Sequence, residues 1–353
     1  MSKIYAVVLT YNRKDLLERC LNAIYAQTRP CDGIIVIDNA STDGTEEQLL
    51  QARHPFLQVY TLADNVGASG GFNAGFRIAY QSGADFVWMM DDDVIADPDA
   101  LQRLEEAGSW LSNEGIEHAY LLSTAFTEQG MVTNSPHLDD RLNQVRYQNW
   151  PLTLQRGMVP VRRATFVSIL VPRSTLQEYG LPLAPMFIWG EDSEFTLRVT
   201  QNSPGFLVGA SRVQHVRQQS GSIDIFSEND PVRIKYHRHL VRNELFVARR
   251  YYSSRRAFMT RLRQWKVVFK LLSLGSVQKA AVVLRGLWES FNFRPIHEAA
   301  DAPLESLGVG IRFHSPAGDT INCVPLKSDD SGPRIDLPTL IVTGHSSAHL
   351  PTH

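Results

Sequence analysis

Cysteine is scarce in this chain, and long hydrophobic runs are missing. Its 353 residues include three cysteines, Cys20, Cys31 and Cys323, too few and too widely spaced for a disulfide framework or a CxxC metal knuckle. A reducing, cytoplasmic compartment is therefore expected. No stretch approaches the roughly 20 apolar residues of a membrane-spanning helix, and the N-terminal apolar run is too short for a signal peptide.

Net charge is also small, at −2, but it is unevenly distributed. The segment from Pro231 to Lys270 carries twelve Lys and Arg residues and one acid, Glu244, so it is +11 and the rest of the chain is −13. This asymmetry indicates an anionic partner, either lipid headgroups or a polyanion. The 43% of hydrophobic residues suffice for a large core and exclude a disordered chain.

Short apolar runs alternate with amphipathic segments over the first hundred residues. Such alternation predicts an α/β fold with a mostly parallel sheet. Asp15 is the expected cap of a helix over Leu16–Ala26, and residues 128–160 have no clear period and are expected to form a loop. The expected strands are Ile4–Leu9, Gly33–Asp38, Leu57–Leu62, Phe86–Met90, Tyr120–Phe126 and Thr165–Val171. The expected divisions are a catalytic domain over 1–220, a basic helical region over 221–300 and a poorly ordered tail over 301–353.

Four polar clusters follow expected strands and begin at Thr10, Asp38, Asn65 and Asp91. In an open α/β sheet, ligands bind outside the carboxyl ends of the strands, so the clusters would converge on one crevice. A nucleotide fits there, with Tyr11 against the base, Asp38 on the base or ribose, and Arg13 near phosphate. The alternative for each cluster is ordinary loop capping.

Glycines follow Asn65, but they do not give a GxGxxG fingerprint after the first strand, and GxxxxGK[ST] is absent. We interpret Gly71 and its neighbours as allowing the backbone to approach a ligand closely.

Asp91, Asp92 and Asp93 directly follow a hydrophobic strand. Adjacent carboxylates repel one another unless a cation lies among them. If the extended conformation continues, Asp91 and Asp93 face one side, and two hard oxygen donors suit Mg²⁺ or Mn²⁺. A solvated acidic turn is the alternative, and a nuclease or polymerase would use the same motif.

A second acidic cluster contains Glu191 and Asp192, next to Trp189. A carboxylate there can accept a proton from a sugar hydroxyl while the indole stacks on the sugar ring. The alternative is an acidic first helical turn that complements the helix dipole. His215 follows an apolar run and is a candidate third metal ligand.

In the basic region, Phe258, Leu262, Trp265, Phe269 and Leu272 recur with helical spacing. An apolar stripe beside basic residues suits the surface of a cytoplasmic membrane leaflet over residues 231–290. Packing on the catalytic domain is an equal alternative, and self-association into a homo-oligomer is a third.

These motifs together resemble the family 2 (GT-A fold) inverting glycosyltransferases, from about Lys3 to about Gln219. The resemblance rests on Val7–Arg13, Ile37–Gly44, Asn65–Gly75 and Met90–Val94. Within the family, Trp88–Asp93, Trp189–Phe195 and His215 look most like bacterial galactofuranosyltransferases and their rhamnosyltransferase relatives. One departure is that Gly190 and Glu191 separate Trp189 from Asp192.

The resemblance implies a role for each matching residue. Asp192, or else Glu191, would be the catalytic base, and Trp189 would bind the acceptor. Asp92 would contact the ribose or sugar of the donor. The nucleotide would be held by Thr10, Arg13, Asp38 and Asn65, and Mn²⁺ or Mg²⁺ by Asp91, Asp93 and His215.

The expected function is thus metal-dependent, inverting transfer of a sugar to a cell-surface polysaccharide or a lipid-linked glycan. UDP-galactofuranose is the first choice of donor and dTDP-rhamnose the second. The enzyme would be cytoplasmic and peripheral on the inner face of the plasma membrane. A nucleotidyltransferase and a catalytically dead carbohydrate- or membrane-binding module are the alternatives. No nucleic-acid partner is expected, although the +11 segment leaves that a weaker option.

Overall fold

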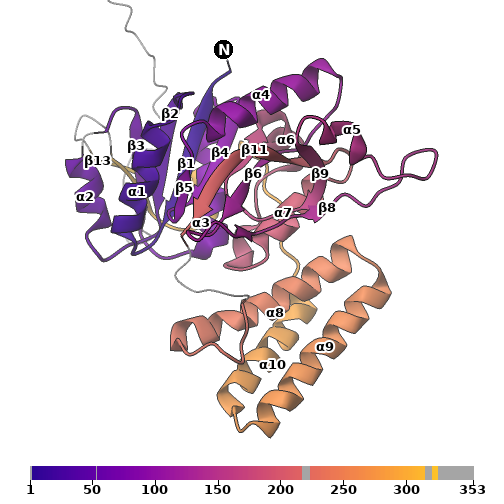
Figure 1. Cartoon of the computed structure of the whole chain (residues 1–353). Coiled ribbons are helices and arrows are strands. Elements are labelled where there is room, and N and C mark those ends of the chain that lie inside the picture. The colour runs from indigo at the N-terminus through magenta and orange to yellow at the C-terminus, as the bar shows by residue number, and fades with distance from the viewer. Residues whose placement is uncertain (1, 53, 217–222, 315–319, 325–353) are drawn as a thin grey trace, which may run out of the picture.

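A 13-stranded sheet with helices on both faces makes up most of the chain, and three long helices form a separate unit beneath it in Figure 1. This computed structural model describes residues 2–52, 54–216, 223–314 and 320–324. The expected α/β class and helical C-terminal region are confirmed. The expected domain boundary near residue 220 lies outside the described residues.

Four parallel strands form the centre of the sheet, in the spatial order β3-β2-β1-β4. Each is a short run of apolar residues buried on both faces, as is typical of parallel strands covered by crossover helices. Because their carboxyl ends lie at one edge, the polar residues that follow them meet there. The bounds are β1 Ile4–Thr10, β2 Gly33–Asp38, β3 Leu57–Leu62 and β4 Phe86–Asp91.

Mixed pairing continues the sheet beyond β4, in the order β10-β6-β11-β9-β8. β6 and β11 are parallel, whereas β10 is antiparallel to both of its neighbours. The loop expected over residues 128–160 in fact contains β7, β8, α5 and the start of β9. The bounds are β5 Val94–Ala96, β6 Leu121–Phe126, β7 Val132–Thr133, β8 His137–Leu138, β9 Met158–Arg163, β10 Ile169–Pro172 and β11 Gly205–His215.

Two hydrophobic clusters lie on opposite faces of the sheet. Val7 and Leu9 pack with α3, while the alternate residues Ala6 and Val8 pack with α1 and α4. Core formation therefore fixes which helix covers which face. The helix bounds are α1 Lys14–Tyr25, α2 Thr45–Gln51, α3 Gly67–Gln81, α4 Ala100–Asn113, α5 Pro151–Leu154, α6 Arg173–Tyr179 and α7 Glu191–Val199, with short 3₁₀ turns at Ala184–Met186 and Leu304–Leu307.

The start of α1 differs from expectation. Asp15 lies within the first turn and does not cap the helix, which begins at Lys14. The amide N of Lys14 instead lies 3.2 Å from a carboxylate oxygen of Asp43, on a neighbouring loop. A partner distant in sequence thus replaces the expected local cap.

Helices α8 Pro231–Tyr251, α9 Ser254–Ser273 and α10 Val277–Asn292 form the separate unit. Asp230 caps α8 by accepting hydrogen bonds from the amides of Val232 and Arg233, and the unit has its own small hydrophobic cluster. The apolar stripe on α9 is solvent-exposed, with Phe258 66% and Phe269 65% exposed. The alternative prediction, that this stripe packs on the catalytic domain, is therefore wrong. No helix in the described part of the chain is long and apolar enough to cross a membrane.

The tail beyond residue 300 was expected to be poorly ordered, but its first part joins the sheet. β12 Ile311–His314 pairs antiparallel with β3, and β13 Thr320–Val324 pairs with β12. Backbone pairing to a strand some 250 residues earlier leaves little trace in a short local sequence. Residues 325–353 lie outside the described part.

Candidate active site

A cavity of about 500 Å³ opens at the carboxyl ends of β1 and β4. Its lining confirms that most of the polar clusters singled out in the sequence meet in one place. The expected site residues that line it are Thr10, Tyr11, Arg13, Asn65, Asp91, Asp92, Asp93, Trp189, Glu191, Asp192 and His215.

The three aspartates do not alternate as an extended segment would. β4 ends at Asp91, and Asp92 and Asp93 form a turn, so all three line the cavity. A guanidinium nitrogen of Arg13 lies 3.1 Å from Asp92 and 2.9 Å from Asp93, and the Thr10 hydroxyl donates to Asp92 at 2.8 Å. Arg13 thus compensates part of this concentrated negative charge.

The pKa values of the three carboxyls separate according to their surroundings. Burial raises the pKa of Asp91 well above its ordinary value and raises that of Asp92 to about 6. Burial also disfavours the ionised form of Asp93. The contacts with His215 and Arg13 favour that form more strongly, so the pKa of Asp93 is lowered. Asp93 is therefore the member of the cluster most favoured as an anion.

Asp93 and His215 face each other in a way that suits a divalent cation. The Asp93 Oδ1 atom is buried without a hydrogen-bond partner, and His215 Nε2 lies 3.2 Å from it. The other imidazole nitrogen, Nδ1, lies 2.9 Å from Asn134 Oδ1. A proton on Nδ1 satisfies that contact, and Nε2 is then left to bind a cation that takes the place of its present contact with Asp93, the arrangement usual for a metal-binding histidine.

The fit to a metal is incomplete for the protein alone. Within the described part of the chain, no three His, Cys, Asp or Glu side chains are arranged to hold an ion. Asp93 and His215 fit as a pair, and the donor's diphosphate and water would have to complete the shell. Asp91 lines the same cavity, but its place in the ligand set stays a prediction.

Asparagines connect the loops that follow β2 and β3 at the edge of the cavity. The side-chain amide nitrogen of Asn39 lies 3.2 Å from Asn65 Oδ1 and 3.1 Å from the carbonyl oxygen of Gly67. Asn65 Oδ1 also accepts from the Gly67 amide at 2.8 Å. Asn39, which belongs with Asp38 to the second polar cluster but was given no role of its own, lines the cavity and helps to hold Asn65 in place.

Two expected donor-binding residues do not line the cavity. Asp38 is fully buried at the end of β2, where its Oδ1 accepts from the Ser41 amide at 2.9 Å. At Gly71, an added Cβ would lie 2.3 Å from a methyl group of Leu9, so this glycine lets α3 pack closely on β1. In this structure the close approach is between two elements of the protein, not between backbone and ligand.

Glu191 and Asp192 begin α7 and differ in position and pKa. Burial, reinforced by the charge of Asp192, raises the pKa of Glu191 to about 8. Burial also raises the pKa of Asp192, but the Ser193 amide and the charge of Arg163 act against it. The pKa of Glu191 thus lies above neutral pH, whereas opposing contacts limit the rise in the pKa of Asp192.

The third acid of this cluster, Glu194, has a structural role. Its carboxylate is buried and paired with Arg198, with a Nε–Oε1 distance of 2.9 Å, and it accepts a hydrogen bond from Tyr251 of α8. Burial disfavours its charge, but these partners prevail and lower its pKa to about 2. Glu194 ties α7 to the helical unit.

Trp189 stands on a loop that α8 holds by its backbone. Trp189 has a left-handed backbone, with φ of 61°, and the Asn243 side-chain amide contacts the carbonyl oxygens of Met186, Ile188 and Trp189 at 2.9–3.1 Å. Nothing in the sequence near Asn243 signals this role, because it depends on how α8 docks.

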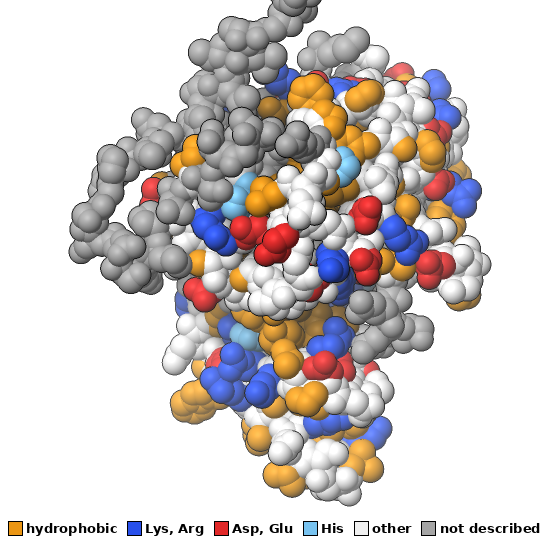
Figure 2. Space-filling view, turned by 90° about the vertical axis from the view of Figure 1, so that its left-hand side faces the viewer, with side chains coloured by type: hydrophobic (Ala, Val, Ile, Leu, Met, Phe, Trp, Pro, Cys, Tyr) orange, Lys and Arg blue, Asp and Glu red, His pale blue; other side chains and the backbone are white. Residues whose placement is uncertain are grey.

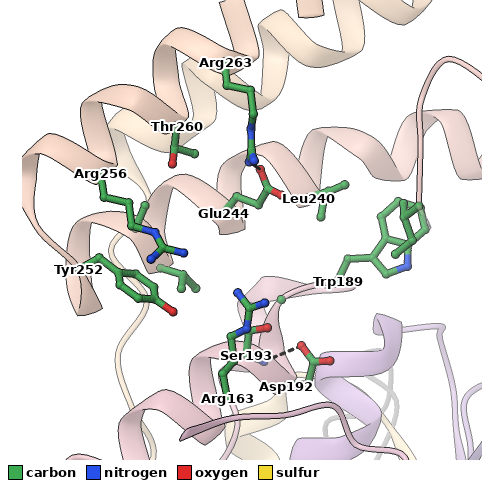
Figure 3. A pocket seen from close by; sticks show the side chains of 14 residues that line it. Arg163, Trp189, Asp192, Ser193, Leu240, Glu244, Tyr252, Arg256, Thr260 and Arg263 are labelled. Carbon is green, nitrogen blue, oxygen red and sulfur yellow. Dashed lines mark hydrogen bonds and ion pairs between the residues drawn. The ribbon is translucent and has the colours of Figure 1, made fainter. Parts of the chain in front are cut away.

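A second cavity, of about 510 Å³, lies between the sheet and the helical unit (Figure 3). Trp189 and Asp192 line it as well as the first cavity. Arg163 of β9 and Arg256 of α9 also line it, and sequence reasoning assigned neither to the site. Asp192 therefore lies where the two cavities meet.

Comparison with known proteins adds a family to this geometry. Residues 5–108 match the family described as Glycosyl transferase family 2. The galactofuranosyltransferase GlfT1 of Mycobacterium tuberculosis (strain H37Rv) is 29% identical over 221 residues, which cover 58% of this chain and 66% of that protein. The protein of the same name from Mycolicibacterium smegmatis is 37% identical over 91 residues, 26% of this chain and 30% of its own. This chain thus matches just under two thirds of the M. tuberculosis protein.

The crystal structure of GalNAc-T7 with UDP, GalNAc and Mn²⁺ is similar in fold, with a TM-score of 0.50 and 15% identity over 70% of this chain and 50% of that one. The likeness confirms the expected GT-A type sheet. The part of this chain that is similar to Glycosyl transferase family 2 is residues 5–108, which include the four parallel strands β1 to β4 except for Ile4.

Proposed function

We propose that this protein transfers a sugar from a nucleotide-sugar donor to a hydroxyl of a glycan acceptor, with inversion at the anomeric carbon. The position of Asp192 carries the proposal. It lines both cavities, so a base at Asp192 meets a donor in one cavity and an acceptor in the other. A base between two substrates is what a single displacement needs.

The donor belongs in the cavity at the strand ends. Tyr11 offers a ring to the base, and the loop that includes Asn65 borders the same space. UDP-galactofuranose is our first choice of donor because relatives are named galactofuranosyltransferases. dTDP-rhamnose is the second choice.

Asp93 and His215, together with Asp91, would hold Mn²⁺ or Mg²⁺. The unpaired Asp93 oxygen beside His215 supports this assignment. When bound, the ion supplies Lewis-acid stabilisation of the charge that develops on the diphosphate leaving group. The Arg13 guanidinium pairs with the carboxylates of Asp92 and Asp93. When the donor binds, it can leave one of these carboxylates and pair with a donor phosphate instead.

The proton of the acceptor hydroxyl passes to the Asp192 carboxylate as the hydroxyl oxygen attacks the anomeric carbon. The bond from that carbon to the diphosphate oxygen breaks, and the nucleoside diphosphate leaves with the electron pair. Trp189, at the same junction, offers an apolar face to the acceptor sugar. Glu191, protonated at neutral pH, is not the base.

The test is nucleoside diphosphate release from a panel of nucleotide sugars, with Mn²⁺ or with EDTA. We expect metal-dependent release of UDP or dTDP that falls about 10²-fold or more in Asp192→Asn. Asp99→Asn, at an exposed carboxylate, is the matched control and should keep full activity. Release of pyrophosphate would instead indicate a nucleotidyltransferase. Binding of UDP without turnover would indicate a catalytically inactive binding module. The proposal would be overturned if no nucleotide sugar of the panel released a nucleoside diphosphate and the protein did not bind UDP.

We also propose that the helical unit rests on an anionic membrane surface, on the cytoplasmic side. α9 exposes Phe258, Leu262, Trp265, Phe269 and Leu272, and α10 exposes Val277, Leu284, Trp288 and Phe291. Arg261 of α9 lies 4.5 Å from the Phe291 ring of α10, which places the two stripes side by side. Basic and hydrophobic side chains both reach the surface of this unit in Figure 2. Apolar side chains bordered by cations match an anionic bilayer.

Vesicle sedimentation tests this contact. The protein should bind phosphatidylglycerol vesicles, bind phosphatidylcholine vesicles weakly, and lose binding in the pair Trp265→Ser and Phe269→Ser. Tyr147→Ser, which removes an equally exposed aromatic ring from the sheet unit, should bind as wild type does. Concentration-dependent dimerisation that the same pair abolishes, without vesicle binding, would mean that a second copy covers this face instead.

A further inference from the structure

Two arginines that line the second cavity, Arg163 and Arg256, form no close ion pair with an acid of the described residues, although the charge of Arg163 also acts on Asp192. Arg163 comes from β9 and Arg256 from α9, and both point into the cavity with the hydroxyl-bearing Tyr252 close by (Figure 3). The Arg256 guanidinium lies 3.8 Å from the centre of the Tyr252 ring. Thr260 and Ser193 add two more hydroxyl groups to the lining.

The third arginine of the cavity is different. Arg263 lies 2.7 Å from the Glu244 carboxylate, and Gln264 donates to the same oxygen at 2.8 Å. That pair is neutral overall. Arg163 and Arg256, by contrast, have no carboxylate within 4.0 Å among the described residues, and Arg163 has the imidazole of His137 as a hydrogen-bond partner.

We propose that this cavity binds an anionic group, a phosphate or a carboxylate, carried by the acceptor glycan. Arg163 and Arg256 receive the anion, the neighbouring sugar lies near Trp189, and the hydroxyl to be glycosylated faces Asp192. This inference rests on the proposed transferase function and adds the chemical class of the acceptor to it.

The apolar side of the cavity fits a ligand that is not charged throughout. Leu240, Val247 and Ala248 of α8 also line it. A sugar offers apolar faces to such a wall, while guanidinium groups match the geometry of phosphate and carboxylate oxygens. A neutral glycan that carries one anionic group can therefore contact both the arginines and the apolar side chains of the cavity.

Three monosaccharides of nearly equal size separate the possibilities: glucose, glucose 6-phosphate and glucuronate. Each is titrated calorimetrically into the full chain with UDP and Mn²⁺ at saturation, so that the donor cavity is filled. We expect at least one of the two anions to bind about tenfold more tightly than glucose, the gain expected of charge-assisted hydrogen bonds. Tighter binding of the phosphate indicates a phosphate-linked acceptor, and tighter binding of glucuronate an acidic polysaccharide.

Arg163→Gln and Arg256→Gln should each remove most of this preference. Arg255→Gln changes the adjacent exposed arginine of α9, which does not line the cavity, and should retain it. Equal binding of all three sugars, or a preference that survives the double variant Arg163→Gln, Arg256→Gln, would overturn the inference. Failure of UDP itself to bind would instead count against the transferase proposal, because the anion preference can still be measured without UDP.

Discussion

The side-chain nitrogen of Asn243 lies 3.0 Å from the backbone carbonyl oxygen of Trp189, and this contact links the helical unit to the residues where the two cavities meet. Asn243 is fully buried, and its Cβ lies 3.1 Å from where a side chain at Gly190 would begin. The left-handed backbone at Trp189 and the glycine after it therefore depend on α8 being in place. A residue outside the glycosyl transferase family 2 match sets the position of the indole.

Replacement of Asn243 by Leu should loosen this loop. The carbonyl oxygens of Ile188 and Trp189 lose this donor, at a cost of about 1–3 kcal/mol for each group left unsatisfied in the interior. The carbonyl oxygen of Met186 keeps the Arg242 guanidinium and the Ile188 amide as donors. We expect lower stability in urea, and a rise in the KM for acceptor larger than any change in UDP affinity. Asn202→Ala, which removes an exposed amide contact with Tyr179, is the control. An unchanged acceptor KM in a folded Asn243→Leu variant would contradict the positioning role.

Glu191→Gln should change how stability depends on pH. The folded-state pKa of Glu191 is about 8, above its ordinary 4.5, so the folded protein keeps a proton that the unfolded chain loses. This contribution is fully present below pH 4.5 and is lost as the pH rises through 8. Wild type should therefore lose stability relative to Glu191→Gln between these pH values, by about 1.4 kcal/mol for each unit of pKa difference.

Chemical denaturation of both proteins from pH 4.5 to 8.5 measures this difference. Parallel curves would mean that Glu191 is ionised in the folded protein. Activity at pH 7 should survive in Glu191→Gln, because the glutamine is neutral like the protonated acid, and should be lost in Asp192→Asn.

Asn134→Leu should weaken ion binding without removing a ligand. Asn134 Oδ1 holds His215 Nδ1 at 2.9 Å and so favours the tautomer with a free Nε2. Loss of such an outer partner typically lowers metal affinity about 10–100-fold. Titration of Mn²⁺ in the presence of UDP, followed by electron paramagnetic resonance, measures the change. Asn149→Ala is the control, because it changes an exposed amide in the same segment, residues 128–160. It should leave the Mn²⁺ affinity unchanged.

Gly71→Ala should affect folding and not the donor. The new methyl group would lie 2.3 Å from Leu9 Cδ1, and overpacking of this kind costs about 1–3 kcal/mol. The melting temperature should fall while the UDP affinity of the folded protein stays within about twofold. A large loss of UDP binding at full stability would restore the interpretation of Gly71 as a donor-binding residue.

The parts of the fold that local sequence determines were predictable. The apolar runs at Ile4–Leu9 and Gly33–Asp38 became parallel strands, and the polar clusters after β1 and β4 line one cavity because parallel strands end at one edge. Glu191 and Asp192 also lie in the first turn of α7, near the helix N-terminus where the sequence placed them. In each case a few neighbouring residues carried the signal.

The parts that depend on distant partners were not predictable. Arg13 and Asp93 form an ion pair although they are 80 residues apart in the sequence. The turn at Asp92 and Asp93 that accompanies this pair is not indicated by any local sequence pattern. Asn134 and Asn243 enter the site through tertiary contacts over 81 and 54 residues. A single sequence does not show which of its many asparagines such contacts will select.

Helix α9 has one more consequence, which follows from its two sides. Arg256 and Thr260 face the second cavity, whereas Leu262 and Trp265 lie on the opposite side of the same helix and are exposed. A helix with its side chains is about 10–12 Å across. If the exposed side rests on the bilayer, the second cavity lies at least that far from the membrane surface, so a glycan anchored in the membrane must extend past α9 before its hydroxyl reaches Asp192.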